Sequence, residues 1–349
     1  MRLNTMVKSL AAVAVAALTM SAVGEAEARV NMKIHSAYGR NLFVIGPGPY
    51  NVADAMEKMS DGEVRMKIFA PGALVPGTKY YDPVSAGSID GAWGTPGFDV
   101  HKNFAYAFFA SVPFGPRAGE YLAWMRHGGG QEMAEEMYGR DNIKFFVCNI
   151  IPPESSGWFR QEINGIADLQ GMKMRFFGLG AKVMEKFGVS TQLLAAGDIY
   201  PALELGSIDA TEFSMPAIDR DLGFYQIAKH NYFPGWHQQS TIGSLLLNMD
   251  SYNKLSDPQK VMLEQACQAQ TLRGFAEGEA GQAEAMAFHE EKGVQIHRWS
   301  DDVLAEFEKA WFSVIEEEIK ESEDAQRIWE SYSSFRDTYE IWRENGYLN

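Results

Sequence analysis

Short segments in which apolar and polar residues alternate recur along the chain, and amphipathic helical segments separate them. Residues 30–36 and 64–70 show the alternation of half-buried strands, whereas 50–59 carries its apolar residues on one helical face. A helical segment at 79–86 then leads to a third strand at 89–93. This βαβαβ order predicts an α/β fold with a parallel or mixed sheet flanked by helices.

A second series of strands begins where two consecutive prolines interrupt the chain. The strongly apolar segment 143–151 ends at Pro152 and Pro153, and residues 154–159 predict a crossing between two lobes. Later strands are expected at 172–177, 191–195, 208–211, 241–249 and 294–299. The pattern therefore predicts two α/β lobes joined by extended crossings.

The C-terminal part of the chain is mostly helical. Ser256, Asp257 and Pro258 form a helix start, and apolar residues continue at helical spacing towards Met286. From Asp301 onward, acidic residues stand beside aromatic ones on amphipathic helices. These aromatic residues are Trp311, Trp329, Tyr332, Phe335, Tyr339 and Trp342. Their number indicates burial, either against the body of the protein or against a second subunit.

The first 28 residues have the pattern of an export signal. Arg2 and Lys8 precede a short apolar core at 10–20, and small residues at positions 26 and 28 form a cleavage site. The apolar core is shorter than the roughly 20 residues that a membrane-spanning helix needs. We therefore expect residues 1–28 to be removed from a periplasmic protein, with an uncleaved membrane anchor as the alternative.

The charge balance narrows the class of partner. The formal net charge is −15, from 46 acidic and 31 basic residues. Because nucleic-acid phosphates need basic partners, we expect no nucleic-acid binding. The net charge does not restrict a small ligand, since the charge within a site can oppose that of the whole protein.

Few residues have the spacing of a catalytic or structural metal site. Cys148 and Cys267 lie far apart in the sequence, so we expect two buried free thiols rather than a disulfide. The sequence contains no phosphate-binding loop, nucleophile elbow or zinc-type spacing. His237 is one of seven scattered histidines, and we expect it to pack or to form hydrogen bonds.

Charged residues at strand ends are the strongest candidates for a binding site. Arg175 lies at the C-terminal end of a short apolar strand, where α/β folds collect ligand-binding residues. Its planar guanidinium suits a carboxylate, although a surface ion pair would use the same residue type. Glu154, Glu212 and Gln238 would offer oxygen ligands to a hard cation, with solvated side chains as the alternative.

Three long motifs are similar to a known family of binding proteins. They are GMKMRFFGLGAKVMEKFG from Gly171, GSIDATEFSMPAIDRDLGFYQIAKHNYFPGW from Gly206, and SYSSFRDTYEIW from Ser331. With the export signal, they resemble the DctP-type solute-binding proteins of TRAP transporters over essentially the whole mature chain. The most similar branch binds 2-oxo and 2-hydroxy acids such as pyruvate and lactate. The resemblance implies a two-lobe α/β fold that delivers a small organic carboxylate to the TRAP membrane subunits.

The resemblance also implies a division of the chain. Lobe 1 would comprise 29–151 and 241–289, and lobe 2 would comprise 152–240 and 290–318, with a long helix spanning both. Residues 319–349 would form C-terminal helices that mediate a homodimer, as in dimeric members of this branch. Two other classes could use the same cleft, namely the binding component of an ATP-driven importer and an exported enzyme.

Site roles carry over by resemblance at five positions. Arg175 matches the arginine that pairs with the substrate carboxylate. Glu212 and the backbone carbonyl of Phe213 match a glutamate–tryptophan pair that holds a cation. Glu154 stands where the branch usually has a glutamine ligand to this cation, and Gln238 stands where a second acid is usual.

These departures change the expected cation and ligand. Two carboxylates at the cation, from Glu154 and Glu212, favour a divalent ion such as Ca²⁺ over Na⁺. The amide of Gln238 changes the contacts available to the end of the ligand opposite its carboxylate. A larger or more polar acid could therefore bind. Further lobe-surface contacts are expected from Tyr38, Tyr80, Tyr81, Trp93 and Trp236, with core packing as the alternative.

Overall fold

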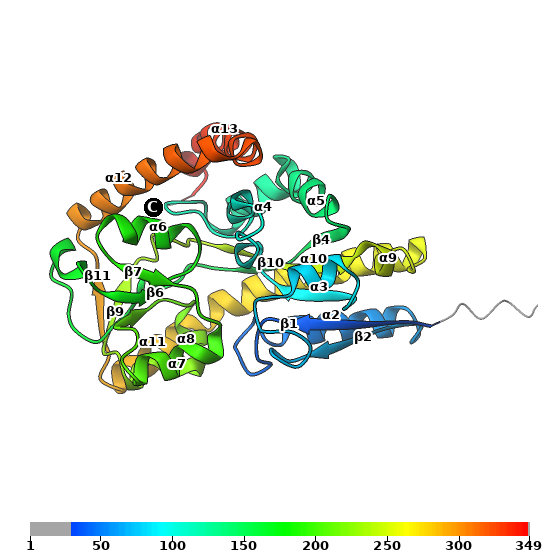
Figure 1. The fold of residues 1–349 in the computed structure, drawn as a ribbon, viewed down its shortest axis with the longest axis horizontal. Helices are drawn as coiled ribbons and strands as arrows, with labels where there is room; N and C mark the ends of the chain where they lie inside the picture. The colour runs from blue at the N-terminus through cyan, green and yellow to red at the C-terminus, as the bar shows by residue number, and fades with distance from the viewer. Residues whose placement is uncertain (1–28, 348–349) are drawn as a thin grey trace, which may run out of the picture.

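Two β-sheets, each covered by helices, form the two lobes of this protein (Figure 1). The computed structural model describes residues 29–347, so the expected export signal at 1–28 lies outside the described residues. The α/β fold with two lobes that the sequence predicts is confirmed. None of the helices in the described part of the chain has the length and apolar character needed to cross a membrane.

Lobe 1 is built on a five-stranded sheet in the order β2-β1-β3-β10-β4. Its strands are β1 (Val30–Ser36), β2 (Val64–Phe69), β3 (Gly91–Gly94), β4 (Ile143–Ile151) and β10 (Thr241–Asn248). The strand β1 runs parallel to β2 and β3, whereas β10 runs antiparallel to β3 and β4. Alternation along β1 buries Met32 and Ile34 and exposes Asn31 and Lys33, as expected for an edge of the core. Helices of this lobe are α2 (Gly48–Met59), α3 (Tyr81–Ser85), α4 (Ala118–His127), α5 (Gly130–Gly139) and α9 (Met249–Tyr252).

Lobe 2 is built on a six-stranded sheet in the order β11-β9-β5-β8-β6-β7. Its strands are β5 (Gly157–Phe159), β6 (Lys173–Arg175), β7 (Ser190–Gln192), β8 (Ala210–Thr211), β9 (His230–Phe233) and β11 (Gln295–Arg298). Its helices are α6 (Gly178–Lys186), α7 (Ala196–Glu204) and α8 (Pro216–Leu222). Short 3-10 helices lie at Pro96–Phe98, Phe104–Phe109, Ile166–Leu169, Phe224–Gln226 and Ile319–Glu321.

The long helix expected from Ser256 towards Met286 is two helices in the structure. The first, α10 (Asp257–Ala280), packs against β4 and α2 of lobe 1, and the second, α11 (Gln282–Glu291), packs against α8 of lobe 2. Gly281 separates them, and a Cβ there would lie 2.6 Å from the Phe43 ring. The two helices therefore bridge the lobes, and α11 lies against lobe 2, although the sequence placed residues up to 289 in lobe 1.

A disulfide joins Cys148 of β4 to Cys267 of α10, so the expectation of two free thiols is wrong. The register of β4 with β10 shifts at this point, because Gly243 pairs with Asn149 and Ser244 pairs with Val147. Cys148 is thus the extra residue of a bulge, which the helix α10 covers. The two Cα atoms lie 4.2 Å apart although 119 residues separate the cysteines, and only the packing of the helix on the strand brings them together.

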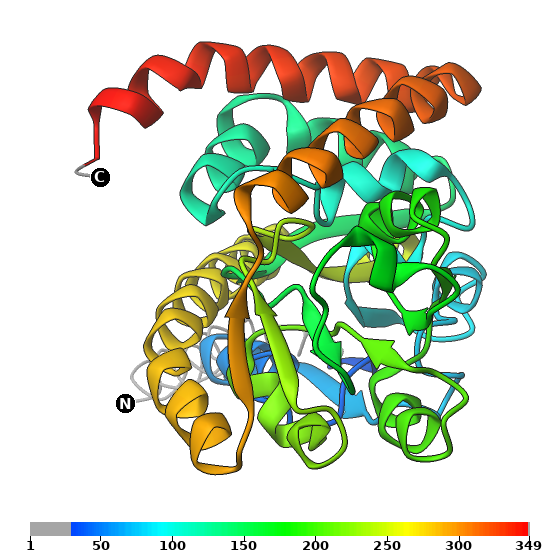
Figure 2. The ribbon, with the colours of Figure 1, turned by 90° about the vertical axis from the view of Figure 1, so that its left-hand side faces the viewer.

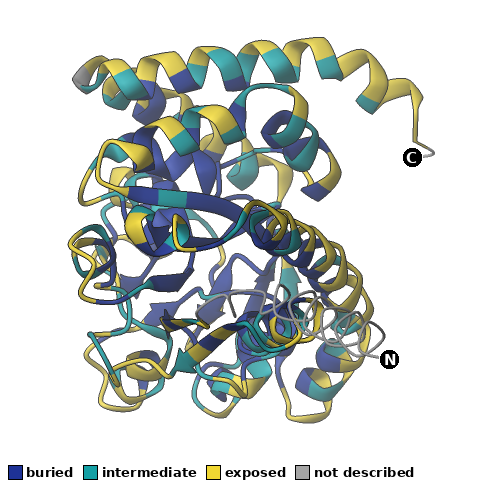
Figure 3. Cartoon of the chain, turned by 90° about the vertical axis from the view of Figure 1, so that its right-hand side faces the viewer, coloured by how far each residue is buried: buried dark blue, intermediate teal, exposed yellow. Residues whose placement is uncertain are grey.

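The two C-terminal helices cross over the body of the protein (Figure 2). The helix α12 (Asp301–Glu318) packs against α6, and α13 (Glu323–Asn345) packs against α4 and α5. Trp311 and Tyr332 are buried, which confirms that part of the aromatic surface covers the body. The last turns of α13 are mostly exposed (Figure 3), and Ile341 and Trp342 retain 73% and 55% of their accessible surface.

Candidate functional site

The lobes meet around a cavity beside the two crossings, residues 152–156 and 234–240. The space in it that a water-sized sphere can occupy measures about 30 Å³. The lining residues come from both lobes and from the crossings: Tyr38, Ile45, Thr95, Phe98, Ile151, Glu154, Arg175, Phe177, Phe213, Ser214, Gln238 and Thr241. Five of the expected site residues, Tyr38, Glu154, Arg175, Phe213 and Gln238, thus share one cavity.

Arg175 ends β6 and is 1% exposed. Its Nη1 donates to both the backbone oxygen and Oε1 of Glu212 at 2.7 Å, and its Nε donates to the Leu194 carbonyl at 3.3 Å. The guanidinium lies 5.0 Å from the centre of the Phe213 ring. No hydrogen bond joins Nη2 to any residue in the described range 29–347. The guanidinium is therefore fixed on one side and has one nitrogen available to a ligand.

Glu212 divides its two carboxylate oxygens between different surroundings. Oε1 accepts from Arg175 and from the Phe177 backbone N–H at 2.5 Å, while Oε2 is buried with no hydrogen-bond partner among the described residues. Burial alone would raise the pKa of this carboxyl. The charge of Arg175, with His237 and the Phe177 N–H, outweighs burial and holds the pKa below its ordinary value. Glu212 therefore carries a negative charge with one unpaired oxygen.

Glu154 lies in the first crossing and is equally buried, at 2% exposure. Its Oε1 accepts from the Ser214 hydroxyl at 2.9 Å, and its Oε2 has no partner within the described part of the chain. Burial raises the pKa of the Glu154 carboxyl well above its usual value, and the negative charge of Glu212 adds to the rise. Two acids in one buried site thus have opposite pKa shifts, which is typical of functional sites.

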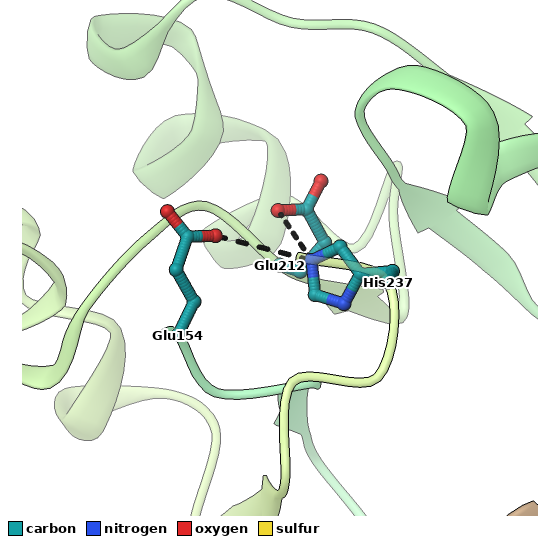
Figure 4. Close-up of side chains that lie close together, drawn as sticks. All are labelled: Glu154, Glu212 and His237. Atoms are coloured by element: carbon teal, nitrogen blue, oxygen red, sulfur yellow. Dashed lines mark ion pairs between the residues drawn. The ribbon is translucent and has the colours of Figure 1, made fainter. Parts of the chain in front are cut away.

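His237 lies between these two acids, with all three side chains directed towards one another (Figure 4). Its Nε2 is 3.7 Å from Glu212 Oε2 and 3.9 Å from Glu154 Oε2, distances too long for hydrogen bonds. Both ring nitrogens are buried and unpaired among residues 29–347. The sequence predicts a packing or hydrogen-bonding role for His237, and the one signal for a ligand role is its position in the aromatic turn beside Gln238.

The three side chains fit a bound cation. One ligand atom from each of Glu154, Glu212 and His237 can be chosen so that all lie within 4.8 Å of one another. Unpaired buried carboxylate oxygens are costly unless a cation or hydrogen-bond donor meets them. Carboxylate oxygens suit hard cations such as Ca²⁺ and Na⁺, and an imidazole nitrogen adds a donor that such ions use less often.

Contacts between the lobes enclose the cavity. Phe98 of lobe 1 meets Phe177 of lobe 2 edge to face, with ring centres 5.5 Å apart. Gly97 lies directly against the Phe177 ring, where a Cβ would collide. The Phe43 N–H donates to Asp221 of lobe 2 at 2.9 Å. The structure therefore shows the lobes in a closed arrangement.

Four other expected contact residues pack away from the cavity wall. Tyr81 hydrogen-bonds Tyr106 at 2.8 Å and Asp141 at 2.6 Å within lobe 1. Trp93 lies against the backbone of Gly48, where a Cβ would be 2.6 Å from its ring. Neither lines the cavity, and this packing matches the core alternative.

The remaining two residues support the wall from behind. Tyr80 donates to the Thr95 carbonyl at 3.2 Å, so it orders a residue that does line the cavity. Trp236 packs between Phe114 and Phe307, with ring centres 5.8 and 4.7 Å away. Both side chains are fully or almost fully buried. They act on the site only through their neighbours.

Comparison with known proteins identifies the family of this chain. The sequence profile of DctP, described as bacterial extracellular solute-binding protein, family 7, matches residues 44–322. A curated relative, the monocarboxylate 2-oxoacid-binding periplasmic protein of Nostoc sp., is 31% identical over 295 residues, which cover 84% of this chain and 81% of the relative.

Two solved structures extend the comparison. A TRAP transporter solute-binding protein from Bordetella bronchiseptica, 29% identical with a TM-score of 0.89, is described as a mixed-occupancy dimer with copurified calcium and picolinate. The match covers 91% of this chain and 95% of that one. A TRAP periplasmic solute-binding protein from Pseudoalteromonas atlantica, with bound sodium and pyruvate, is 26% identical with a TM-score of 0.85 and covers 90% and 96%.

The profile match spans most of the chain, and the curated relative is similar over more than two thirds of both proteins. The two solved structures share the fold across nearly their whole length. This chain therefore belongs to family 7 of the bacterial extracellular solute-binding proteins, the DctP family, and is a periplasmic solute-binding protein of a TRAP transporter.

Proposed function

We propose that the protein captures a small 2-oxo or 2-hydroxy monocarboxylate together with Ca²⁺ and presents both to the TRAP membrane subunits. The observation that carries this proposal is a set of unpaired side-chain atoms: Arg175 and Glu154 line the cavity, and the buried Glu212 lies against them, paired with Arg175. Arg175 has a free Nη2, while Glu154 and Glu212 each have an unpaired oxygen. A carboxylate bound to a cation would satisfy all three.

Arg175 binds the ligand carboxylate in this proposal. Its Nη1 and Nε are occupied by Glu212 and Leu194, so the guanidinium cannot rotate without losing these bonds. A donor that is already oriented loses little conformational entropy when the ligand binds. The ion pair with Glu212 also keeps the arginine charge buried before the ligand arrives.

Glu154 and Glu212 would hold the cation, with His237 and the Phe213 carbonyl as further ligands. The cation would neutralise the acids and polarise the oxo or hydroxyl oxygen of the ligand. Relatives have bound sodium or calcium, and two carboxylates in this chain favour the divalent ion because ligand charge tunes such sites. The Nostoc relative is named for 2-oxoacids, and the Pseudoalteromonas protein holds pyruvate, which supports the class of acid.

Closure of the lobes over the ligand would complete the mechanism. The division proposed from the sequence would hold, with 29–151 and 241–289 in lobe 1 and 152–240 and 290–318 in lobe 2, except that α11 would move with lobe 2 because it packs against α8. Movement would occur about the two crossings. The ligand favours the closed state only through contacts that the open state lacks. The Phe98–Phe177 contact and the Phe43–Asp221 hydrogen bond are such contacts between the lobes.

Titration calorimetry with pyruvate tests the proposal directly. The protein is stripped with a chelator and then titrated in Ca²⁺, in Na⁺ and in buffer without either ion. We expect binding with Ca²⁺, weaker binding with Na⁺, and little without a cation. Binding that is indifferent to both ions contradicts the cation role, whereas no binding of any 2-oxo or 2-hydroxy acid contradicts the ligand class.

We also propose that the last turns of α13 mediate a homodimer. Ile341 and Trp342 are exposed on this helix and Tyr347 is exposed just after its end, and the Bordetella structure is described as a dimer. Light scattering should report twice the monomer mass, and Trp342→Asp together with Ile341→Asp should reduce it. A wild-type monomer at micromolar concentration contradicts this assembly.

The family match favours this reading over the two alternatives. DctP proteins are solute receptors, so a binding role without chemistry is expected here rather than an exported enzyme. The similarity to TRAP proteins also favours a secondary transporter over an ATP-driven importer. Mass spectrometry of the acid recovered after binding should therefore show it unchanged.

A further inference from the structure

The lobe 1 side of the cavity carries two hydroxyl groups that nothing in the described structure satisfies. Thr95 follows β3 and Thr241 begins β10, and both residues line the cavity. They are 3% and 2% exposed, and neither Oγ1 has a hydrogen-bond partner among residues 29–347. Buried hydroxyls usually find a partner, so these two indicate a polar group of the ligand.

Gln238 adds a third unpaired atom to the same cavity. Its side chain is 3% exposed, and its Oε1 has no partner in the described part of the chain. An amide oxygen accepts hydrogen bonds and cannot donate them, whereas each threonine hydroxyl can do both. A ligand group that satisfies all three must therefore be able to donate as well as accept.

The arrangement of charges decides which end of the ligand reaches these atoms. Arg175 and Glu212 are the charged groups, and a bound cation would also deprotonate Glu154; together they would take the carboxylate and the cation-bound oxygen on carbon 2. The remaining end of the acid then faces Thr95 and Thr241 of lobe 1. A methyl group there, as in pyruvate or lactate, would leave the hydroxyls unpaired, whereas a hydroxyl group would both donate and accept.

We propose that Thr95, Thr241 and Gln238 select an acid with a hydroxyl on carbon 3, that is, a 3-hydroxy-2-oxo or 2,3-dihydroxy acid. This inference rests on the proposed function and specifies the ligand of the same site. The apolar residues Ile45 and Phe98 also line the cavity, and the smallest acids that carry this hydroxyl have three carbons. A site built to hydrogen-bond a substrate hydroxyl discriminates strongly against the analogue that lacks it.

Matched pairs of acids test the proposal in calorimetry with saturating Ca²⁺. One pair is pyruvate and 3-hydroxypyruvate, and the other is lactate and glycerate, each enantiomer measured separately. We expect the hydroxylated member to bind at least about tenfold more tightly in both pairs. Pyruvate binding that equals or exceeds 3-hydroxypyruvate binding, with lactate likewise matching glycerate, overturns the inference but leaves the proposed function intact. Failure of all four acids to bind overturns both.

Threonine variants locate the preference. Thr95→Val and Thr241→Val keep the side-chain shape but lose the hydroxyl, and each should remove most of the preference. The matched Thr95→Ser and Thr241→Ser variants should retain it. Thr271→Val is the control, because its hydroxyl bonds the Cys267 carbonyl within α10, outside the cavity lining. An undiminished preference in both valine variants contradicts the role of the threonines, and the wild-type comparison decides the ligand even if a variant fails to fold.

Discussion

The two walls of the cavity differ in charge although one chain builds both. Lobe 2 and the first crossing line the cavity with Arg175 and Glu154, and Glu212 pairs with Arg175 behind the wall, whereas lobe 1 supplies neutral side chains such as Tyr38 and Thr95. Strong electrostatic attraction is thus confined to one side. In the proposed function, binding strength would therefore come mainly from lobe 2 and the first crossing, and selectivity from lobe 1 and Gln238.

A comparison of two buried acids shows how this difference is maintained. Glu212 in lobe 2 keeps its charge because Arg175 pairs with it. Asp99 of lobe 1, next to the lining residue Phe98, has no such partner: burial raises its pKa to about 8, and the Tyr138 hydroxyl and Lys102 offset this only in part. Asp99 is therefore neutral at pH 7, and lobe 1 presents no charged acid beside the cavity.

The lobes also differ in covalent constraint. The Cys148–Cys267 disulfide ties α10 to the sheet of lobe 1, and no described cysteine lies in lobe 2. The helix α10 must therefore move with lobe 1, while α11 packs on lobe 2. Lobe 1 is therefore the covalently constrained lobe, whereas lobe 2 carries the charged residues Arg175 and Glu212.

Removal of the arginine should have the largest effect. Arg175→Ala leaves Glu212 buried without its partner, so ligand affinity should fall by at least about a hundredfold. The unfolding free energy without ligand should also fall, by about 3–5 kcal/mol. Calorimetry and denaturant titration measure these quantities.

Two controls separate charge from geometry in the Arg175 experiment. Arg220→Ala removes a partly exposed ion pair with Glu284 and should cost less than about 1 kcal/mol. Arg175→Lys keeps a charge beside Glu212 but loses the planar fork, so stability should recover more than affinity. If Arg175→Ala binds pyruvate as tightly as the wild type, Arg175 does not bind the ligand carboxylate.

Loss of the disulfide tests the constraint on lobe 1. Cys148→Ser with Cys267→Ser should lower the unfolding free energy by about 2–5 kcal/mol, because the bond closes a loop across 119 residues of separation. Thermal unfolding with and without a reductant provides the measurement. Ligand affinity should change little, since neither cysteine lines the cavity. A large loss of affinity with unchanged stability would assign the disulfide to lobe closure instead.

Substitution of Glu154 tests whether this residue is a ligand of the bound cation. Glu154→Gln removes one carboxylate and should weaken Ca²⁺-dependent binding by about tenfold, leaving Na⁺ nearly as effective. The experiment is ligand titration in each ion after chelation. Glu284→Gln, an exposed acid outside the cavity, is the matched control. Unaltered preference for Ca²⁺ in Glu154→Gln would remove Glu154 from the cation site.

Asp99 should make the stability of the folded protein depend on pH. Its carboxyl ionises near pH 8 in the folded protein and near pH 4 in the unfolded chain, so the folded state binds an extra proton between these values. Stability should therefore fall as the pH rises through this window, by up to about 1.4 kcal/mol per pH unit. Asp99→Asn should flatten the slope in denaturant titrations from pH 5 to 8, while the exposed Asp82→Asn should not. An identical slope in Asp99→Asn would show that Asp99 is not the group responsible.

The charged residues at the cavity, Arg175, Glu154 and Glu212, could largely be predicted from the sequence. Arg175 is the last residue of β6 and Glu212 directly follows β8, and the ends of these neighbouring strands meet at one edge of a sheet. Glu154 lies directly after the proline pair that ends β4. The local sequence was sufficient here, because the alternation of apolar and polar residues predicts where a strand ends even when its neighbouring strands are unknown. The sequence did, however, separate Arg175 and Glu212 into independent roles, whereas the structure joins them in one ion pair.

Only the tertiary structure showed which uncharged residues of lobe 1 line the cavity and that Cys148 and Cys267 form a disulfide. Tyr81 and Trp93 are residue types that often contact ligands, yet both pack inside lobe 1. The direction in which a side chain points depends on packing against residues distant in the sequence. The same reason explains Cys148 and Cys267, which meet only when α10 lies on a bulge of β4. His237 became a candidate ligand once two acids were seen on either side of it. The sequence by itself determined the alternation of strands and helices and the residue types at their ends. Long-range packing alone decided which of those residues face the same space.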